Sequence, residues 1–216
     1  MSLHFSKPLI ILGAGGHAKV IYDVLTQLEA EVIGCVSPDL EVGSKFCNTR
    51  ILGGDKVIQN FHKDEILLVN GIGSLPYKQK RWEIALKMRN DGYKFATIIH
   101  PKAIIATEVE LCEGVQIMAG VVIQAGSKIS QDTIINTGVL IDHDCTIRQN
   151  CHLAPGSSLC GGVEIGSNTH IGAGAILTEY ISIGSNCKIG AGSLIYKSVA
   201  DNVSLKQVNE LKIGPK

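Results

Sequence analysis

Residues 105–195 read IATEVE LCEGVQ IMAGVV IQAGSK ISQDTI INTGVL IDHDCT IRQNCH LAPGSS LCGGVE IGSNTH IGAGAI LTEYIS IGSNCK IGAGSL I, in groups of six that each begin with Ile or Leu. The residue two places before each of these positions is small or β-branched throughout. A period of six fits neither an α-helix, at about 3.6 residues per turn, nor a coiled coil, at about 3.5. It is typical of a prism-shaped parallel β-solenoid, in which each hexad is a short strand plus a corner. Three hexads complete a coil, so the stretch predicts a solenoid of about five coils.

Glycine marks the corners of this predicted solenoid. Eight of the 24 Gly residues share one hexad phase, where a positive φ or close stacking of coils favours glycine. These glycines stand at 114, 120, 126, 138, 156, 162, 174 and 192. An isolated solenoid leaves flat faces and open ends, so we expect the chain to form oligomers.

Composition excludes several classes of partner. Among the 216 residues, Lys plus Arg and Asp plus Glu each number 20, so the formal net charge is zero. Nucleic acid and anionic membrane surfaces are therefore not expected partners. With no apolar run of about 18 residues and no charged-then-apolar leader, neither membrane insertion nor a secretory signal is expected. The seven Cys residues contain no Cys-x-x-Cys pair. Cys145, Cys151 and Cys187 fall at the small-residue position of the solenoid hexads, two places before an Ile or Leu, which predicts buried thiols. We therefore expect a reducing cytoplasm.

The chain before the solenoid has a different pattern. Apolar runs alternate with helix-like stretches, which predicts a small Rossmann-like parallel α/β sheet. We expect strands at 8–12, 31–36 and 65–69, helices at 19–28 and 78–90, and a short helix at 54–61. The predicted organisation is an α/β domain at residues 1–99, the solenoid at 100–199 and a tail at 200–216.

A Gly-rich turn follows the first predicted strand and opens the first helix. It reads Gly13-Ala-Gly-Gly-His-Ala18, and its backbone N–H groups with the helix N-terminus can bind phosphate. The turn matches the dinucleotide fingerprint loosely, but the second strand ends at Ser37-Pro38, with Asp39 one step on, where that fingerprint needs an acid. This weakens an NAD interpretation and leaves a nucleotide diphosphate, or a merely tight turn, as alternatives.

One solenoid hexad carries candidate catalytic groups. His143 lies between Asp142 and Asp144, and a carboxylate beside an imidazole raises its basicity, as a general base requires. A solvated corner is the alternative explanation. Nothing in the spacing of His143, His152 and His170 requires them to converge, so no metal is expected.

Four segments together resemble a known family. They are Leu12–Ala18, residues 70–74 (Asn-Gly-Ile-Gly-Ser), His100-Pro101 and residues 135–144 (Ile-Asn-Thr-Gly-Val-Leu-Ile-Asp-His-Asp). They resemble the sugar O/N-acetyltransferases of the left-handed β-helix superfamily, which include sialic acid O-acetyltransferases, perosamine N-acetyltransferases and the enzymes that acetylate UDP-4-amino sugars in the bacillosamine pathway. The resemblance spans about residues 7–199, and the combination of Gly-turn domain and His-Asp hexad is its most specific part.

The resemblance implies a cytoplasmic homotrimer that transfers acetyl from acetyl-CoA to the amine of a nucleotide-activated amino sugar. The implied sugar is of the UDP-4-amino-4,6-dideoxy-N-acetylglucosamine type, and the product would serve bacterial surface glycan or glycoprotein synthesis. It assigns His143 as the base and Asp144 as the acid that raises its basicity. Nucleotide-sugar contacts fall at Gly15, Gly16, His17, Ser37, Pro38, Gly73, Asn136 and Asp142. Acetyl-CoA contacts fall at His152, Gly161, Ala173 and Ala191.

The sequence departs from the family at two places. Many relatives carry paired acids where Ser37-Pro38 stands, and many end in Gly-x-Pro-Ala-Lys where this chain ends in Asn209–Lys216. Three alternatives remain open at this stage: an O-acetyltransferase of sialic acid or another sugar hydroxyl, a non-catalytic nucleotide-binding solenoid, and an NAD-dependent oxidoreductase. A Cys acyl-enzyme is disfavoured because the Cys residues lie on the buried phase without an evident base.

Overall fold

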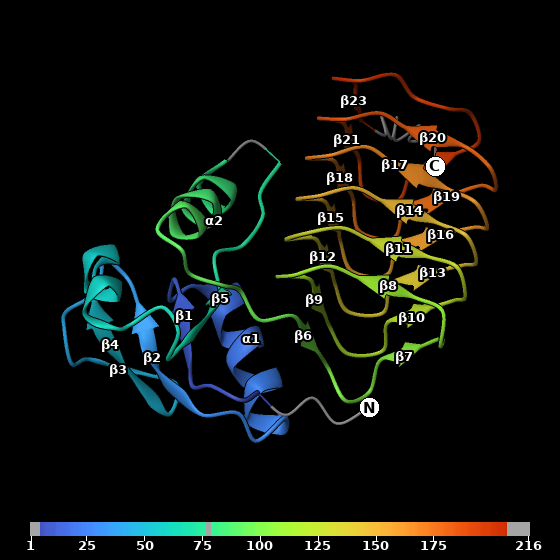
Figure 1. Cartoon of the computed structure of the whole chain (residues 1–216). Helices are drawn as coiled ribbons and strands as arrows, with labels where there is room; N and C mark the ends of the chain where they lie inside the picture. Colours follow the sequence, from blue (N-terminus) through green and yellow to red (C-terminus); the bar gives the residue numbers. More distant parts are fainter. Residues whose placement is uncertain (1–4, 77–78, 207–216) are drawn as a thin grey trace, which may run out of the picture.

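The computed structural model describes residues 5–76 and 79–206. The first part is an α/β domain of eight elements. They are β1 (Leu9–Leu12), α1 (Gly16–Gln27), β2 (Val32–Val36), β3 (Lys45–Phe46), β4 (Thr49–Gly53), η1 (Asp55–Asn60), β5 (Leu67–Asn70) and α2 (Lys80–Asn90). The strands form one sheet in the order β3-β4-β2-β1-β5, with α1 on one side and α2 and η1 on the other (Figure 1).

The sheet is mixed rather than wholly parallel. β1 pairs in parallel with β2 and β5, and β2 pairs in parallel with β4, as the α/β pattern predicts. β3 and β4 form an antiparallel hairpin, which the sequence pattern does not predict. A two-residue strand such as Lys45–Phe46 is too short to show an alternating pattern, and this is the physical reason for the omission.

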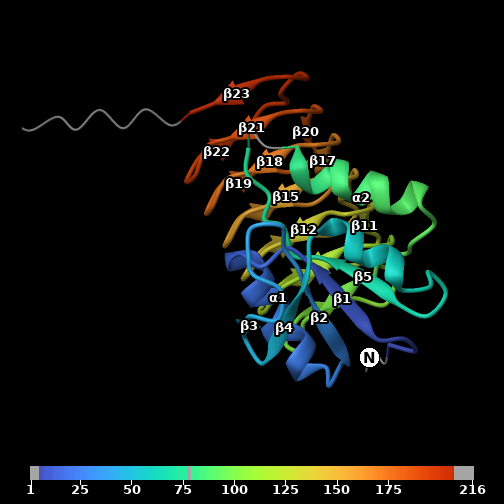
Figure 2. The same cartoon turned by 90° about the vertical axis from the view of Figure 1, so that its left-hand side faces the viewer.

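The second part is a parallel β-solenoid with three faces. We name them the docked face, which the α/β domain covers, the apolar face and the polar face (Figures 1 and 2). The docked face contains β6 (Ile98–Ile99), β9 (Gln116–Ile117), β12 (Ile134–Ile135), β15 (His152–Leu153), β18 (His170–Ile171), β21 (Lys188–Ile189) and β23 (Ser204–Leu205). The apolar face contains β7 (Ile104–Ile105), β10 (Val122–Ile123), β13 (Leu140–Ile141), β16 (Ser158–Leu159), β19 (Ile176–Leu177) and β22 (Leu194–Ile195). The polar face contains β8 (Glu110–Leu111), β11 (Lys128–Ile129), β14 (Thr146–Ile147), β17 (Glu164–Ile165) and β20 (Ser182–Ile183).

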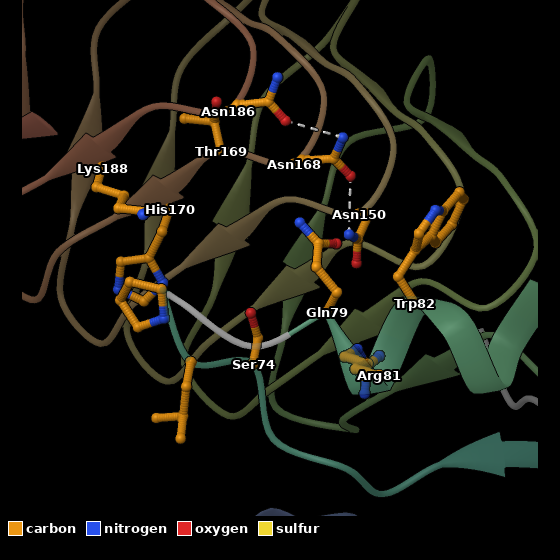
Figure 3. A pocket seen from close by; sticks show the side chains of 12 residues that line it. Ser74, Gln79, Arg81, Trp82, Asn150, Asn168, Thr169, His170, Asn186 and Lys188 are labelled. Atoms are coloured by element: carbon orange, nitrogen blue, oxygen red, sulfur yellow. Dashed lines mark hydrogen bonds between the residues drawn. The ribbon is translucent and has the colours of Figure 1, made fainter. Parts of the chain in front are cut away.

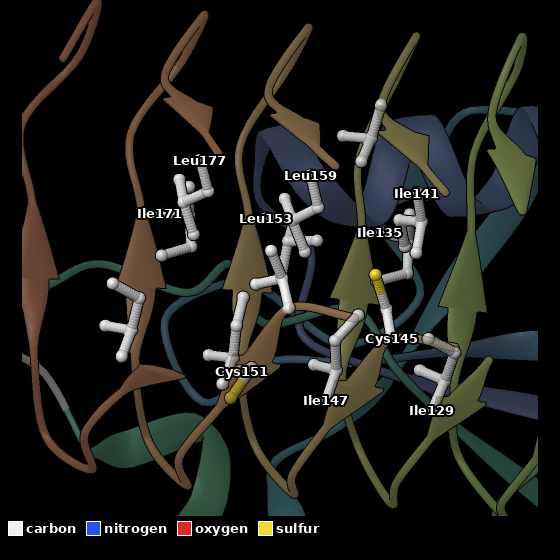
Figure 4. Packing of buried hydrophobic residues seen from close by; sticks show 14 of the residues in the cluster. Ile129, Ile135, Ile141, Cys145, Ile147, Cys151, Leu153, Leu159, Ile171 and Leu177 are labelled. Atoms are coloured by element: carbon white, nitrogen blue, oxygen red, sulfur yellow. The ribbon is translucent and has the colours of Figure 1, made fainter. Parts of the chain in front are cut away.

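The hexad pattern gives each strand one inward and one outward residue. The second residue of each strand points into the prism, where Ile and Leu side chains stack in files with Cys145 and Cys151 between them (Figure 4). Cys187 is buried in the same core, so the predicted burial of all three thiols is confirmed. The first residue points outward. On the apolar face this outward position is occupied by exposed Ile104, Leu140, Ile176 and Leu194, among others.

The predicted corner positions of the solenoid are confirmed. From residue 114 to 192, every sixth residue has φ between 54° and 76°, in the left-handed region. Glycine occupies eight of these positions, Asp and Asn occupy all the others but one, and the last is Tyr180. Asn and Asp tolerate this backbone conformation better than other side chains, whereas a bulky residue rarely adopts it.

The solenoid is longer at both ends than the hexad stretch. β6 begins it at Ile98, before the predicted boundary at residue 100, and Ser204–Leu205, predicted as tail, forms β23 against β21. With sheets of seven, six and five strands the solenoid has about six coils. The sequence at Asn209–Lys216, whose departure from the family was noted, lies outside the described residues.

An ion pair joins the two parts of the chain. From α2, the Arg89 guanidinium donates to both oxygens of Asp132, at 2.6 and 3.0 Å, and to Glu113 Oε1 at 3.1 Å. Its carbon lies 4.5 Å from the centre of the Phe95 ring. Asp132 is 1% exposed, so the pair is desolvated and each partner is needed to neutralise the other. The α/β domain is thereby held on the docked face.

Candidate active site

The corner after β13 holds a hydrogen-bonded His-Asp pair. Asp142 Oδ1 accepts from the His143 backbone N–H at 2.8 Å, and His143 Nδ1 lies 2.8 Å from Asp144 Oδ2. Asp144 stands at the left-handed position of the corner, with φ 59°. If the imidazole is neutral, the carboxylate holds the proton on Nδ1 and leaves the lone pair of Nε2 outward.

Two glycines make room for this pair on the neighbouring coils. A Cβ at Gly161 would lie 2.5 Å from His143 Nε2, and a Cβ at Gly126 would lie within van der Waals overlap of Asp144 Oδ1. The His143 ring therefore rests on the backbone of Gly161 in the next coil. The family resemblance implies that Gly161 contacts acetyl-CoA, and in the structure Gly161 also sets the position of the His143 ring.

The electrostatics of this corner suit a base. The hydrogen bond to Asp144, with the charges of Asp142 and Asp144, raises the pKa of His143 above its usual value. The ring is half exposed, with 50% of its side chain accessible. The ring is therefore accessible to a reactant from solvent, and the raised pKa makes the imidazole a better proton acceptor.

The Gly-rich turn opens onto a separate cavity of about 320 Å³. Gly15, Ser37, Pro38 and Gly73 line it, as the resemblance implies, and Gly16 begins α1 beside them. Its walls also include Asp39, Asp55 and Lys80, which are not among the site residues predicted from the sequence. Asp39 places a carboxylate one residue beyond Pro38, near the position where the fingerprint expects an acid. The cavity thus offers helix N–H groups and a lysine for phosphates, and carboxylates for hydroxyls.

His17 follows the Gly turn but does not line this cavity. Its Nε2 lies 2.8 Å from Gln116 Oε1 on β9, and Gln116 in turn donates to the carbonyl of Asn70 at 2.8 Å. Burial lowers the pKa of His17 to about 4, so the ring is neutral at pH 7. In this structure His17 connects the turn to the solenoid, rather than reaching into the predicted substrate pocket.

His152 and Asn136 lie together at the edge of the docked face. Asn136 Nδ2 is 3.2 Å from His152 Nε2, and the His152 ring meets the His170 ring edge-on at 4.8 Å. Burial, followed by the neighbouring His170, lowers the pKa of His152 to about 3. A neutral imidazole of this kind can serve as a hydrogen-bond partner but is a poor proton acceptor at pH 7.

The remaining predicted acetyl-CoA residues line a different corner from His143. Ala173 and Ala191 lie between the docked and apolar faces, beside a mainly apolar cavity of about 310 Å³ that also contacts Pro76, Ala154 and Lys188. His143 and Gly161 lie between the apolar and polar faces. Within one chain the two groups therefore stand at opposite edges of the apolar face, and the structure does not bring them together.

A polar cavity of about 220 Å³ separates α2 from the third corner (Figure 3). Arg81 and Trp82 of α2 face Thr169 and His170 across it. Its far wall is a ladder of amides in successive coils, with Asn150 donating to Asn168 at 2.9 Å and Asn168 to Asn186 at 3.3 Å. The ladder satisfies side chains at left-handed corner positions, and we assign it a structural role.

Neither a metal centre nor a membrane span is found among residues 5–76 and 79–206. No three His, Cys, Asp or Glu side chains in this part gather closely enough to hold a metal ion. No described helix has the length and apolar character needed to cross a bilayer.

Comparison with known proteins places this arrangement in a family. Residues 8–87 match the PglD N-terminal domain, and residues 144–179 and 162–197 match the bacterial transferase hexapeptide (six repeats). The sequence is 32% identical to a mutant of perosamine N-acetyltransferase from Caulobacter crescentus, which was solved in complex with CoA and GDP-perosamine. The match covers 94% of this chain and 95% of that one, with a TM-score of 0.86. It is 27% identical to the acetyltransferase domain of PglB from Neisseria gonorrhoeae, solved with acetyl coenzyme A, over 93% and 96% of the two chains, with a TM-score of 0.86. No curated protein matches significantly.

The fold and the His-Asp corner thus define a hexapeptide-repeat acyltransferase that carries an N-terminal α/β domain. The chain belongs to the PglD-type N-acetyltransferases, which are acetyl-CoA-dependent enzymes of nucleotide-activated amino sugars. The family predicted from the sequence, its β-helix architecture and its co-substrate acetyl-CoA are confirmed. This membership favours N-acetylation over the alternatives of an O-acetyltransferase, a non-catalytic solenoid or an oxidoreductase.

Proposed function

We propose that the chain transfers acetyl from acetyl-CoA to the amine of a nucleoside-diphosphate 4-amino sugar, with His143 as the general base, in a cytoplasmic homotrimer. The observation that carries this proposal is the half-exposed His143–Asp144 pair, with Nδ1 at 2.8 Å from the carboxylate and Nε2 over Gly161. The sequence resemblance favours a UDP-4-amino-4,6-dideoxy-N-acetylglucosamine type of acceptor, and the perosamine relative binds a GDP sugar.

The proposed reaction proceeds by direct transfer. The amine nitrogen attacks the thioester carbonyl carbon, and His143 Nε2 accepts the proton that the nitrogen loses. The C–S bond of the tetrahedral intermediate then breaks, and the departing CoA thiolate takes the proton from the imidazolium. Asp144 holds the tautomer and stabilises the transient positive charge. The intermediate's oxyanion needs donors, for which backbone N–H groups and His152 are the candidates.

The exposed apolar face supports a shared active site. A cyclic trimer with this face toward its axis would bury Leu140, Ile176 and Leu194. Rotation about the axis would bring the His143 corner of one copy against the Ala173–Ala191 corner of the next. Both predicted halves of the acetyl-CoA site would then meet between chains, and the Gly-turn cavity would belong to the second chain, because Pro76 of its α/β domain lies beside Ala173.

A thiol-release assay tests the activity directly. CoA formation is measured with acetyl-CoA and a panel of UDP- and GDP-4-amino sugars, with the matching 4-hydroxy sugars as controls. Turnover of at least one amino sugar and none of the hydroxy sugars is expected. His143→Ala should lower kcat about 10²–10⁴-fold without a change in Tm, because a corner imidazole contributes little packing. Wild-type turnover by this variant would remove His143 from the mechanism.

Mixed trimers test the sharing of the site. His143→Ala and Gly15→Val damage opposite halves, so each homotrimer should lose most of its activity when the nucleotide sugar is held well below its KM. Subunit exchange between them should create some interfaces with both halves intact and restore part of the activity. If each chain carried a complete site, the mixture would stay as inactive as its components. Sedimentation of each protein verifies that the trimers form.

A further inference from the structure

Tyr180 places a bulky, exposed side chain at a left-handed corner of the solenoid. It follows β19 at φ 56° and is 73% exposed. Along the stretch 114–192, every other described residue at this phase is Gly, Asp or Asn. A bulky side chain in the left-handed region is a genuine outlier, and such outliers concentrate at functional sites. The same corner, two coils earlier, carries Asp144.

The Tyr180 ring lies next to the proposed reacting group. A Cβ at Gly162 would lie 2.5 Å from Tyr180 Cδ1, so the ring rests on this glycine. The His143 ring rests in the same way on Gly161. His143 belongs to the preceding coil and Tyr180 to the following one, so the two rings approach the Gly161–Gly162 peptide from opposite sides.

We propose that the Tyr180 ring binds the pantetheine arm of acetyl-CoA and positions its thioester against His143. This proposal rests on the shared site of the proposed function. On the N-terminal side of the His143 ring stand Asp142 and Asp144, whose carboxylates can accept hydrogen bonds from the sugar amine. On the C-terminal side stands an aromatic ring, which suits an uncharged chain of methyl and amide groups.

The opposite edge of the apolar face supports the same assignment. At the coil level of Tyr180, the corner between the docked and apolar faces carries Gly172 and Ala173, which line the mainly apolar cavity. In the trimer this corner of the neighbouring copy would face Tyr180. A narrow channel between an aromatic ring and small residues would accept an extended pantetheine arm. The charged Gly-turn cavity would then remain available for the nucleotide sugar.

Tyr180→Gly is a clean test because it installs the residue that the corner backbone favours. The KM and the calorimetric Kd for acetyl-CoA should both rise about tenfold, while KM for the amino sugar stays within about twofold. Tm should hold or increase, and the trimer should persist. Tyr180→Phe should retain near wild-type values because the ring makes the contact. Glu29→Gly, an exposed left-handed position at the end of α1, is the matched control and should change neither constant.

Three results would overturn the proposal. Unchanged acetyl-CoA constants in Tyr180→Gly would show that the ring makes no contact with the co-substrate. A rise confined to the sugar KM would place the ring on the acceptor, and dissociation of the trimer would make Tyr180 an interface residue. If the wild-type protein acetylates no sugar at all, the proposed function fails, while the Kd of acetyl-CoA still decides the role of Tyr180.

Discussion

Gly161→Ala is expected to inactivate the enzyme without unfolding it. The added Cβ would lie 2.5 Å from His143 Nε2, 2.6 Å from Cε1 and 3.2 Å from Cδ2. Ordinary contact begins near 3.4 Å, so the imidazole must move by roughly 1 Å. A displacement of about 1 Å from a reactive geometry can cost about 10²-fold in rate. This corresponds to about 2.7 kcal/mol of transition-state stabilisation.

The stability of this variant should not fall. Gly161 does not have a positive φ, and the contacted group is the exposed end of a side chain, so the backbone accepts Ala. Substitution of a glycine at such a position commonly stabilises by about 0.4–1 kcal/mol through the unfolded state. The assay is kcat by thiol release, measured beside a thermal melt and the KM of both substrates.

Two other glycines serve as controls. In Gly54→Ala the new Cβ would meet only Pro38, at 3.7 Å, so rate and Tm should both remain near wild type. In Gly166→Ala it would lie within overlap of the Ser185 backbone, which cannot move aside, so Tm should fall although His143 is untouched. Wild-type kcat in Gly161→Ala would refute the argument, since the ring would then work from another position or not at all.

Three further predictions follow from the same contacts. Asp144→Asn weakens the hydrogen bond and removes the charge by which Asp144 raises the His143 pKa. Because activity requires the neutral ring, the acid limb of the kcat–pH profile should move to lower pH as kcat falls. An unmoved limb would assign the raised pKa to Asp142. Arg89→Met leaves the buried Asp132 carboxylate unpaired and should lower the free energy of unfolding in urea by about 3–5 kcal/mol, and adding Asp132→Asn should recover much of the loss. In Gly15→Val the new side chain projects into open cavity space, so KM for the nucleotide sugar should rise about tenfold or more while KM for acetyl-CoA changes little. The reverse pattern would mean that acetyl-CoA, and not the nucleotide sugar, binds at the Gly-rich turn.

Much of the solenoid was predictable because its period maps directly onto space. Residues 18 positions apart stack in successive coils, as Asn150 and Asn168 do, so the hexad phase identifies inward, outward and corner positions. The His143–Asp144 pair was predictable for a simpler reason, since the two residues are adjacent in sequence. The β3–β4 hairpin was not predictable, because its short strands carry no periodic signal.

Side-chain direction along the solenoid axis was beyond the sequence. The hexad phase says that a corner residue points outward, but not whether it leans toward the preceding or the following coil. His143 leans forward onto Gly161, whereas Asp144, its neighbour, leans back onto Gly126. The contact between Gly161 and the ring of the proposed base follows from this choice of direction.

The division of the site between two corners also depends on information that no single motif contains. The α/β domain docks on the face that begins with β6, where Ile98 and Met118 join the core around α1. That choice places His152, Ala173 and Ala191 beside the domain and leaves His143 across the apolar face from them. The family resemblance implies a role for all four residues but does not specify which chain supplies each. We propose from the docked face and the apolar face together that a second copy completes the site, and the exchange of subunits between damaged trimers tests this proposal.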